Sequence, residues 1–160
     1  MNQVYLLIGG NLNNRLELLA QAKESIVKDI GSCIMESSVY ESEPWGFLSD
    51  QNFLNQVLIL NTKLEPIEVL NESQKIENKL GRLRKSTNYS SRTMDIDLLF
   101  YNNEIINNPR LTVPHEHLYK RRFTLEPLVE LTPDFMHPVF EKSLAKLLIE
   151  CSDKSVVKKL

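Results

Sequence analysis

The chain has 160 residues, of which 42% are apolar and 25% are charged, and these values are close to the average of globular proteins. We therefore expect a single domain over residues 1–160 that is large enough to bury a core of its own. No apolar run approaches the roughly 18 residues that a membrane span needs, so composition excludes a membrane protein and a cytoplasmic location is expected.

The formal net charge of −2 is unevenly distributed. Residues 82–122 contain eight Lys or Arg and four acidic residues, a net charge of +4, which leaves −6 for the remainder. Such a local excess suits a compact polyanion, whereas a long nucleic acid usually needs a broader basic surface, and we expect no nucleic-acid partner. Cys33 and Cys151 have no CxxC spacing and indicate neither a disulfide framework nor a zinc site.

The first part of the chain predicts a strand, a helix and a second strand. Residues 3–8 are apolar, lack a preceding basic region and end at Gly9, which indicates a buried strand rather than a signal peptide. Apolar residues then recur at helical spacing until Gly31 closes the helix. Residues 33–43 show a strand-like alternation, and residues 44–52 are expected to form a loop.

The rest of the chain continues the alternation of strands and helices. Residues 53–64 predict a long apolar strand, Pro66 suits a helix start, and Gly81 suits the end of that helix. Residues 82–91 are polar and irregular, as in a loop. The remaining predictions are a strand over 93–101, a short apolar piece at 105–106, helical segments at 117–130 and 143–150, and a frayed tail over 152–160.

This order of elements predicts the fold class. The sequence βαββαβ, with helices of similar length between strands, is the split βαβ pattern of an α+β fold with a ferredoxin-like βαββαβ core. In that fold, helices cover one face of a largely antiparallel sheet. The C-terminal helical segments are the candidates for covering the other face, so we expect helices on both faces.

Two carboxylates stand one residue apart in the apolar strand of residues 93–101. Side chains alternate in a strand, so Asp95 and Asp97 share one face, about 6 to 7 Å apart, while their apolar neighbours point to the other face. A solvated sheet face would explain a lone DxD. Arg92, just before the strand, favours a second interpretation, because a cation that binds phosphate beside carboxylates that hold Mg²⁺ is what phosphoryl transfer requires.

Further polar residues could extend such a site. Gln74 and Glu77 lie three apart on a predicted helix, beside its apolar stripe, and by themselves are expected at the surface. His115 precedes Arg121 by six residues, so an imidazole and a cation could converge on phosphate, although a lone histidine is more often structural. The cations of residues 82–85 belong either to an ordinary solvated loop or to a lid over a phosphate tail.

Other catalytic motifs are missing from the sequence. Residues 9–11, Gly-Gly-Asn, match neither GxGxxG nor the P-loop pattern, so a Rossmann or Walker nucleotide site is not indicated. No HExxH motif and no Ser/His/Asp order indicates a hydrolase. Any nucleotide must therefore be held in another way.

Together these motifs resemble the 6-hydroxymethyl-7,8-dihydropterin pyrophosphokinase family of the folate pathway. The resemblance covers nearly the whole chain and rests on LIGGNL, YESEPWG, QNFLNQV, GRLRK, SRTMDIDLLFYNNEIIN, RLTVPHEHLYKRRFTLEPL and DFMHP. RTMDIDLL followed by LTVPH is the most specific part. Residues 88–91, Asn-Tyr-Ser-Ser, stand where the family usually has Arg-Trp-Gly-Pro.

The resemblance implies a role for each matching residue. The catalytic residues it implies are Arg82, Arg92, Asp95 and Asp97, with Asp95 and Asp97 as ligands of two Mg²⁺ ions. It assigns to the ATP side Gln74, Glu77, Arg84, Lys85, Arg110, Thr112, His115 and Arg121. It assigns to the pterin side Ser42, Glu43, Pro44, Trp45, Phe53, Asn55 and Phe123. The last three also suit a flat heteroaromatic ring, which needs aromatic faces and an amide at its edge.

The implied reaction transfers pyrophosphate from ATP to the pterin alcohol and releases AMP. Its small-molecule partners are ATP and 6-hydroxymethyl-7,8-dihydropterin, and family members occur free-standing or fused to other folate-pathway enzymes. Two alternatives remain: a ferredoxin-like binding module for nucleotide or RNA, and a different Mg²⁺-dependent transferase on the same scaffold. The first lacks the aromatic pattern of RNA-reading sheets, and the second has no need of Phe53, Asn55 and Phe123.

Overall fold

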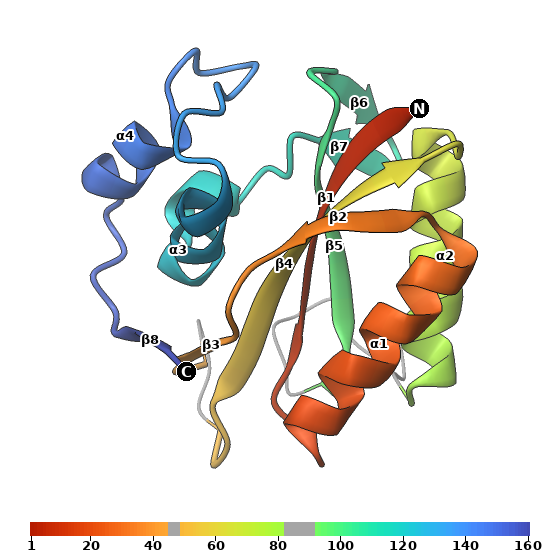
Figure 1. The fold of residues 1–160 in the computed structure, drawn as a ribbon. Helices are drawn as coiled ribbons and strands as arrows, with labels where there is room; N and C mark the ends of the chain where they lie inside the picture. The colour runs from red at the N-terminus through yellow and green to blue at the C-terminus, as the bar shows by residue number, and fades with distance from the viewer. Residues whose placement is uncertain (45–48, 82–91) are drawn as a thin grey trace.

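A computed structural model describes residues 1–44, 49–81 and 92–160 (Figure 1). Its strands are β1 (Asn2–Gly10), β2 (Ser32–Glu36), β3 (Tyr40–Ser42), β4 (Phe53–Thr62), β5 (Asp95–Tyr101), β6 (Ile106–Asn108), β7 (Leu111–Val113) and β8 (Val157–Lys159). Its helices are α1 (Arg15–Asp29), α2 (Pro66–Lys79), α3 (Arg122–Leu131) and α4 (Leu144–Glu150), with a 3₁₀ turn at Leu118–Lys120. The predicted loop of residues 82–91 lies outside the described residues.

The main sheet is antiparallel at every described pairing. Its strand order is β5-β1-β4-β3-β8, and β2 pairs with the same edge of β4 as β3 does. Strands β6 and β7 form a separate two-stranded hairpin. The predicted strands over 3–8, 53–64 and 93–101 are confirmed as β1, β4 and β5, three adjacent strands of the sheet, with β5 at its edge.

Helices cover both faces of this sheet, as expected (Figure 1). On one face, α1 and α2 pack on a core that includes Val4, Leu6 and Ile8 of β1. On the other face, α3 and α4 pack on a second core that includes Tyr5 and Leu7. Alternate residues of β1 therefore serve opposite cores, because successive side chains of a strand point to opposite faces.

Helix ends follow the predicted signals. Pro66 is the first residue of α2, where its missing N–H costs nothing, and Gly81 follows α2 with a φ of +95°. This left-handed conformation favours glycine because it has no Cβ. Gly31 follows α1 for a different reason: a Cβ there would lie 2.2 Å from the carbonyl oxygen of Asn61 on β4.

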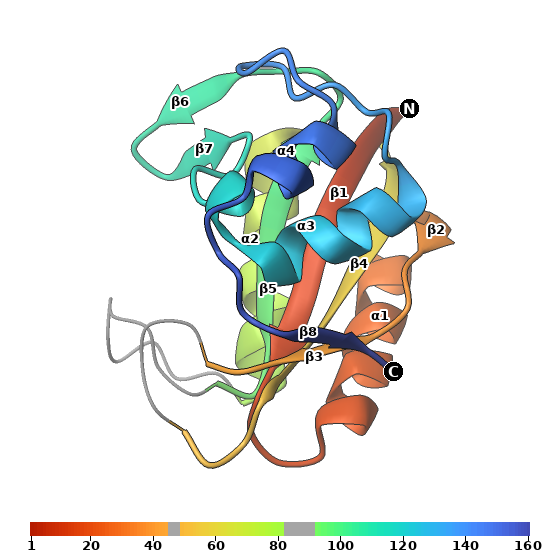
Figure 2. The same cartoon turned by 90° about the vertical axis from the view of Figure 1, so that its left-hand side faces the viewer.

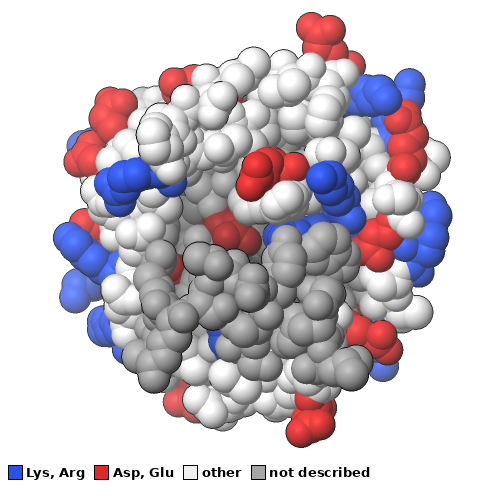
Figure 3. Space-filling model, turned by 180° about the vertical axis from the view of Figure 1, so that it is seen from behind, with Lys and Arg blue, Asp and Glu red and all other residues white. Residues whose placement is uncertain are grey.

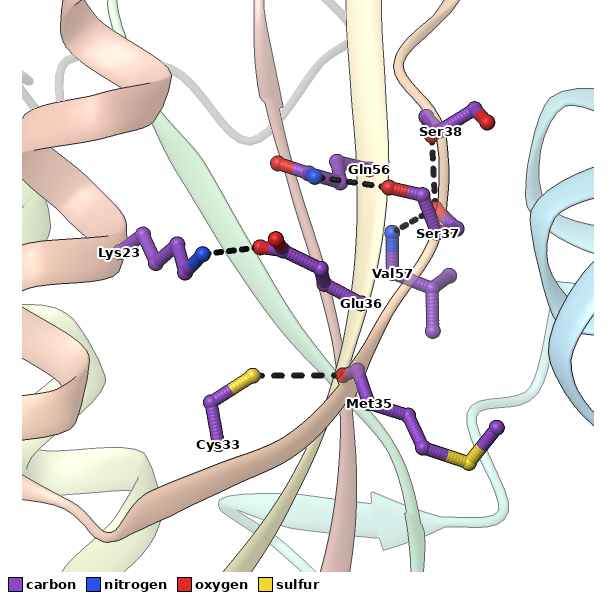
Figure 4. A network of polar contacts seen from close by, with 8 residues as sticks. All are labelled: Lys23, Cys33, Met35, Glu36, Ser37, Ser38, Gln56 and Val57. Atoms are coloured by element: carbon purple, nitrogen blue, oxygen red, sulfur yellow. Dashed lines mark hydrogen bonds and ion pairs between the residues drawn. The ribbon is translucent and has the colours of Figure 1, made fainter.

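The single strand expected over 33–43 is wrong, because the structure divides it into β2 and β3. Ser37 lies at the break and is buried. Its Oγ accepts a hydrogen bond from Val57 N at 2.9 Å, its backbone N donates to Val57 O at 2.9 Å, and its carbonyl accepts from Gln56 Nε2 at 2.8 Å (Figure 4). Ser37 thus supplies hydrogen-bond partners to β4 at the point between its two partner strands. An ion pair between Lys23 and Glu36 joins α1 to β2 just before the break.

Two C-terminal predictions also need correction. The tail over 152–160 is not frayed, because its β8 pairs with β3 and Leu160 N donates to Val39 O at 2.9 Å. The helical segment predicted over 117–130 is two elements, a 3₁₀ turn and α3, separated at Arg121 by extended backbone with φ −121° and ψ 109°. None of the described helices is both long and apolar enough to cross a membrane.

The helices leave one end of the sheet open. Figure 2 shows α3 and α4 in front of the upper part of the sheet, while β1 ends and β5 begins beyond α3. The short strands β3 and β8 lie beside this open end in both ribbon views. Residues at the end of β1 and the start of β5 are therefore the ones that can face a ligand on this side.

Glu130 joins α3 to the β3 edge. Its carboxylate accepts hydrogen bonds from the Tyr40 hydroxyl at 2.7 Å and from Ser38 N and Oγ at 3.1 Å. Partial burial opposes ionisation, but these hydrogen bonds outweigh it and lower the pKa of Glu130. For Tyr40, burial together with the Glu130 carboxylate raises the pKa.

We expect Glu130→Gln to lower the thermal unfolding midpoint at neutral pH by roughly 2 °C, since hydrogen bonds to an exposed carboxylate contribute little. A lowered folded-state pKa adds stability that is present above the ordinary glutamate range and is lost as pH falls through the lowered value. The difference from wild type should therefore shrink below about pH 4. Thermal unfolding followed by circular dichroism across pH 3–7, with exposed Glu104→Gln as control, would show it; a difference independent of pH would contradict it.

Candidate active site

A pocket opens at the end of the sheet that α3 leaves uncovered. Its described lining consists of Leu7, Gly9, Ser42, Glu43, Phe53, Asn55, Arg92, Asp95, Asp97, Arg121 and Phe123. Seen from behind, the molecule has a hollow in which acidic and basic side chains lie close together, next to the residues drawn in grey (Figure 3). The pocket therefore combines charged groups with aromatic rings.

Strand alternation explains why these residues meet. Leu7 of β1 and Val57 of β4 belong to the core under α3 and α4, so residues two positions further toward the open end, Gly9 and Asn55, face the pocket. Gly9 and Asn55 are direct partners in the β1–β4 pairing. On β5, Asp95 pairs with Gly9 and Asp97 with Leu7. Asn55 of β4 and the two aspartates of β5 thus face the pocket on either side of Leu7 and Gly9 of β1.

The prediction that Asp95 and Asp97 share a face is confirmed. Both line the pocket, whereas Met94, Ile96 and Leu98 belong to the opposite core. Burial is the main cause that raises the pKa of Asp97, and the negative charge of Asp95 adds to it, while Arg121 and Arg92 act in the opposite direction. Two carboxylates that resist ionising together suit a divalent cation, and their oxygen ligands are those that Mg²⁺ prefers.

Two arginines lie on the carboxylate side of the pocket. Arg92 Nη1 contacts Asp95 Oδ2 at 2.8 Å, which orients the guanidinium beside the carboxylate pair. Arg121 is 8% exposed, although it lines the pocket, and its guanidinium carbon lies 5.7 Å from the centre of the Phe123 ring. Guanidinium groups in this position can bind phosphate oxygens.

The opposite side of the pocket carries flat and amide groups. Phe53 begins β4, Phe123 lies in the first turn of α3, and Asn55 is 5% exposed between β1 and β3. A Cβ on Gly9 would lie 2.1 Å from Asn55 Oδ1, so glycine is required for the amide to occupy this position. Ser42, also buried, completes this side from β3 together with Glu43.

Glu77 is buried, contrary to the expectation of a surface residue. It is 2% exposed, and its Oε2 accepts a hydrogen bond from Ile96 N at 2.8 Å. Ile96 stands between the two aspartates, and β1 pairs with the other edge of β5, so Glu77 takes the place of a strand partner there. Glu77 thereby fixes the backbone that carries the carboxylate pair. Gln74, one turn earlier, is half-buried.

His115 is held as a neutral group. Burial first, then the charges of Arg121 and His117, lower the pKa of His115 to about 4. Its Nδ1 accepts a hydrogen bond from His117 N at 3.2 Å, so Nε2 carries the proton. At neutral pH this imidazole can donate one hydrogen bond and adds no positive charge to the arginines.

Other predicted residues fall outside the described lining. Arg110 and Thr112 are exposed on or beside the β6–β7 hairpin, where Arg110 Nη2 donates to Asn71 Oδ1 at 2.6 Å. Pro44 follows Ser42 and Glu43 without lining the pocket. The predicted roles of Arg82, Arg84, Lys85 and Trp45 fall on residues outside the described part of the chain.

Sequence reasoning missed Gly9 and Asn11. Asn11 is completely buried just after β1, where its side chain binds two segments that are distant in sequence. The signal for Gly9 was present in the sequence, because a glycine at the end of an apolar strand often marks a close approach of another group. The buried partners of Asn11 gave no such signal, since they come from residues 49–51 and from Arg92.

The scaffold and the pocket define a class: an antiparallel sheet with helices on both faces, and a pocket with paired carboxylates and arginines facing aromatic rings. The model of the family described as 7,8-dihydro-6-hydroxymethylpterin-pyrophosphokinase (HPPK) matches residues 5–133. The chain belongs to the HPPK family.

Curated relatives agree with this assignment, and a solved structure shares the fold. The 2-amino-4-hydroxy-6-hydroxymethyldihydropteridine pyrophosphokinase of Aquifex aeolicus is 39% identical over 90% of this chain and 89% of that relative. The protein of the same name from Haemophilus influenzae is 35% identical over 99% of this chain and 98% of that relative. The fold is similar to Plasmodium falciparum HPPK-DHPS, with a TM-score of 0.74 at 16% identity over 94% of this chain, which spans only 43% of that longer chain.

Replacing Glu77 should separate its backbone contact from its charge. We expect Glu77→Ala to cost about 1–3 kcal/mol of unfolding free energy, because Ile96 N would lose its buried acceptor, whereas Glu77→Gln keeps a carbonyl there and should cost less. Denaturant unfolding would measure both, with Glu72→Ala on the same helix as control. Equal losses for the alanine and glutamine variants would contradict a role in holding the backbone of β5.

Proposed function

We propose that this chain transfers a pyrophosphoryl group from ATP to 6-hydroxymethyl-7,8-dihydropterin, giving the pterin diphosphate and AMP. The observation that carries this proposal is the composition of one pocket, in which carboxylates and arginines face two aromatic rings and a buried amide. Two relatives that match this chain over most of their own length carry the name of this activity. A transferase with a protein or nucleic-acid acceptor would have no use for the aromatic side.

The pterin end of the pocket fits the chemistry of a flat ring. Phe53 and Phe123 offer apolar faces against which a bicyclic ring can pack, and such contacts favour offset stacking. Asn55 can both donate and accept along the ring edge, because its carboxamide carries two donors and one acceptor. Its near-complete burial makes an unmatched ring edge costly, so the amide would select for complementary polar atoms.

The phosphate end of the pocket fits the transfer of a pyrophosphoryl group from one oxygen to another. The pterin hydroxymethyl oxygen attacks the β-phosphorus of ATP, the bond from that phosphorus to the α–β bridging oxygen breaks, and AMP leaves while the hydroxyl proton passes to water. Arg92 and Arg121 would bind the phosphate oxygens and stabilise the charge that develops on them. The chain contributes mainly position and charge here, as is general for phosphoryl transfer.

We further propose that Asp95 and Asp97 hold Mg²⁺. When bound, this ion neutralises phosphate charge and lowers the pKa of the attacking hydroxyl. The support is the shared pocket face of the two carboxylates and the raised pKa of Asp97, both of which a divalent cation would compensate. Glu77 keeps β5 in the position that presents them.

The scaffold beneath this site is, we propose, a ferredoxin-like βαββαβ core. Its support is the sheet order: α1 connects β1 to β2 on the far side of β4, and α2 connects β4 to β5 on the far side of β1. Each helix therefore joins strands that have another strand between them, which is the split βαβ arrangement. The additional elements are β3, the β6–β7 hairpin, β8 and the two C-terminal helices.

The test is AMP formation from ATP, Mg²⁺ and 6-hydroxymethyl-7,8-dihydropterin, with controls that omit the pterin or add EDTA. We expect AMP only when pterin and metal are both present. AMP formation without pterin would identify a hydrolase instead, and its absence in the complete mixture, with both substrates shown to be intact, would overturn the proposed function.

Removing one carboxylate should affect turnover more than folding. We expect Asp97→Asn to lower kcat by at least about a hundredfold, because it removes charge from the pair that would hold Mg²⁺. The same variant should bind Mn²⁺, a spectroscopic substitute for Mg²⁺, more weakly in the presence of ATP. Asp134→Asn, an exposed aspartate, is the matched control. Near-normal turnover of Asp97→Asn at saturating Mg²⁺ would refute the metal assignment.

Asn55→Ala should act on one substrate only. We expect pterin affinity to fall by about ten- to a hundredfold, the range for losing a hydrogen bond in a buried site, with ATP affinity unchanged within about twofold. Calorimetric titration of each ligand would measure this, with Asn61→Ala at the other end of β4 as control. A larger effect on ATP would mean that the two sides of the pocket have been assigned in reverse.

A further inference from the structure

We propose that the C-terminal segment, residues 153–160, positions two walls of the pterin side of the pocket. This inference rests on the proposed function, because it concerns the shape of the pocket that serves that reaction. The first wall is the beginning of α3, which carries Phe123, and the second is β3, which carries Ser42. Figure 2 shows the chain after α4 passing the beginning of α3 and continuing to β8, beside β3. No residue of the segment belongs to the described lining of the pocket.

Asp153 caps α3 from a distant part of the chain. The first N–H groups of a helix have no partner within it, and the side chain of the preceding residue usually supplies one. Arg121 holds that position before α3, and a guanidinium has no acceptor with which to cap a helix. Asp153 Oδ2 instead accepts a hydrogen bond from Arg122 N at 3.0 Å. The negative charge of Asp153 also suits the positive end of the helix dipole.

The carboxylate of Asp153 is held in this orientation by its own neighbours. Its Oδ1 accepts hydrogen bonds from Ser155 N at 3.0 Å and from Ser155 Oγ at 2.6 Å. Partial burial opposes ionisation, but the hydrogen bonds from Ser155 and Arg122 outweigh it and lower the pKa of Asp153. Asp153 is therefore a charged cap at neutral pH.

Phe123 depends on this cap because it is the second residue of α3. The first turn of a helix frays when its N–H groups lack an acceptor, and fraying would move the Phe123 ring from its place in the pocket. A pterin would then bind only the molecules in which the turn is formed, and its apparent affinity would fall by that fraction. Arg121 is also held from the 3₁₀ turn, because its backbone N donates to Leu118 O at 3.4 Å, so the phosphate side should be affected less.

The second wall is held by the pairing of β8 with β3. Strand β3 has only three residues, and it pairs with β4 on one edge and with β8 on the other. Ser42, its last residue, is 4% exposed and stands opposite both Phe53 of β4 and Val157 of β8. Leu160 N donates to Val39 O at 2.9 Å, which extends the pairing past the strand. Without β8, this short strand would have hydrogen-bond partners on one edge only.

The two walls and the segment form a closed arrangement. The segment meets α3 at its first residue and β3 along its whole length. Glu130, in the last turn of α3, joins that helix back to β3 through the hydroxyl of Tyr40. A displacement of one of these three elements would therefore break contacts with the others. Asp153 is a positioning residue in this arrangement, because it acts on a ligand only through α3.

The experiment measures affinity on each side of the pocket without turnover. The probes are 6-hydroxymethylpterin and an ATP analogue with a methylene group between the α and β phosphorus atoms, both with Mg²⁺. Calorimetry gives the Kd of the analogue alone and the Kd of the pterin for protein saturated with the analogue. A general loss of folding would weaken both probes, whereas a displaced pterin wall would weaken mainly the pterin.

The first wall is tested by changing the helix cap. Asp153→Ala should raise the pterin Kd about five- to tenfold and the analogue Kd less than about twofold, because the first turn of α3 loses its acceptor. Asp153→Asn keeps an oxygen for Arg122 N, and its amide can donate to the Ser155 hydroxyl, so its pterin Kd should rise less than about threefold. Ser143→Ala is the matched control: it removes the cap of α4, where Ser143 Oγ accepts from Lys146 N at 3.2 Å, and should leave the pterin Kd unchanged.

The second wall is tested at Lys158, an exposed residue in the middle of β8. Proline has no N–H and does not fit within a paired strand, so Lys158→Pro should raise the pterin Kd at least about threefold. Lys158→Ala is its matched control, because it keeps the backbone and should leave the pterin Kd unchanged. If Asp153→Ala does not fold, Ser155→Ala, which removes one hydrogen bond to the Asp153 carboxylate, should raise the pterin Kd at least about twofold.

The outcomes separate this inference from the proposed function. Wild-type protein that binds neither probe would contradict the proposed function itself. Wild-type protein that binds both, with an unchanged pterin Kd in Asp153→Ala or in Lys158→Pro, would overturn the role of the segment at the corresponding wall. Equal losses for the two probes would overturn its assignment to the pterin side. An equal loss in Ser143→Ala would also overturn it, because the effect would then follow the loss of any helix cap.

Discussion

The register of three antiparallel strands is the constraint on which the site depends. Gly9 of β1 is paired with Asn55 on one side and with Asp95 on the other. In each strand, alternate residues face the side of the sheet on which α3 and α4 lie. Beneath these helices the residues form the apolar core, and where the helices end they line the pocket. A shift of one residue in any pairing would send the polar groups into the opposite core, so the core and the site specify the same register.

The elements around the pocket hold several charged side chains close together. Burial and the charge of Asp95 both oppose the ionisation of Asp97. A strand with a purely structural role would gain nothing from this energetic cost. Glu77 adds a further carboxylate but uses it to accept a hydrogen bond from β5, and Arg92 offsets the negative charge from the same end. The arrangement therefore offers groups of both charges to a ligand, which is consistent with the proposal that ATP binds there with Mg²⁺.

Single polar side chains join segments that are far apart in sequence. Asn11 ties β1 to both flanking segments, and Ser37 allows β4 to exchange one partner strand for another. Glu130 connects α3 to the same edge through Ser38 and Tyr40. These contacts hold short, irregular pieces of chain, for which neither a helix nor a long strand supplies the hydrogen bonds.

The sequence by itself determined the central elements, the shared face of Asp95 and Asp97, and the family resemblance, because period-two and helical patterns and short motifs are local properties. It could not determine the break at Ser37, the pairing of β8 or the burial of Glu77, since each depends on a partner distant in the chain. The local sequence around a polar residue does not show whether the folded chain places a buried hydrogen-bond donor beside it. Only the tertiary structure decided that Glu77 accepts a hydrogen bond from the edge of β5 and that the buried Asn11 bonds to the segments before both β4 and β5, because hydrogen-bond partners are chosen by proximity in space.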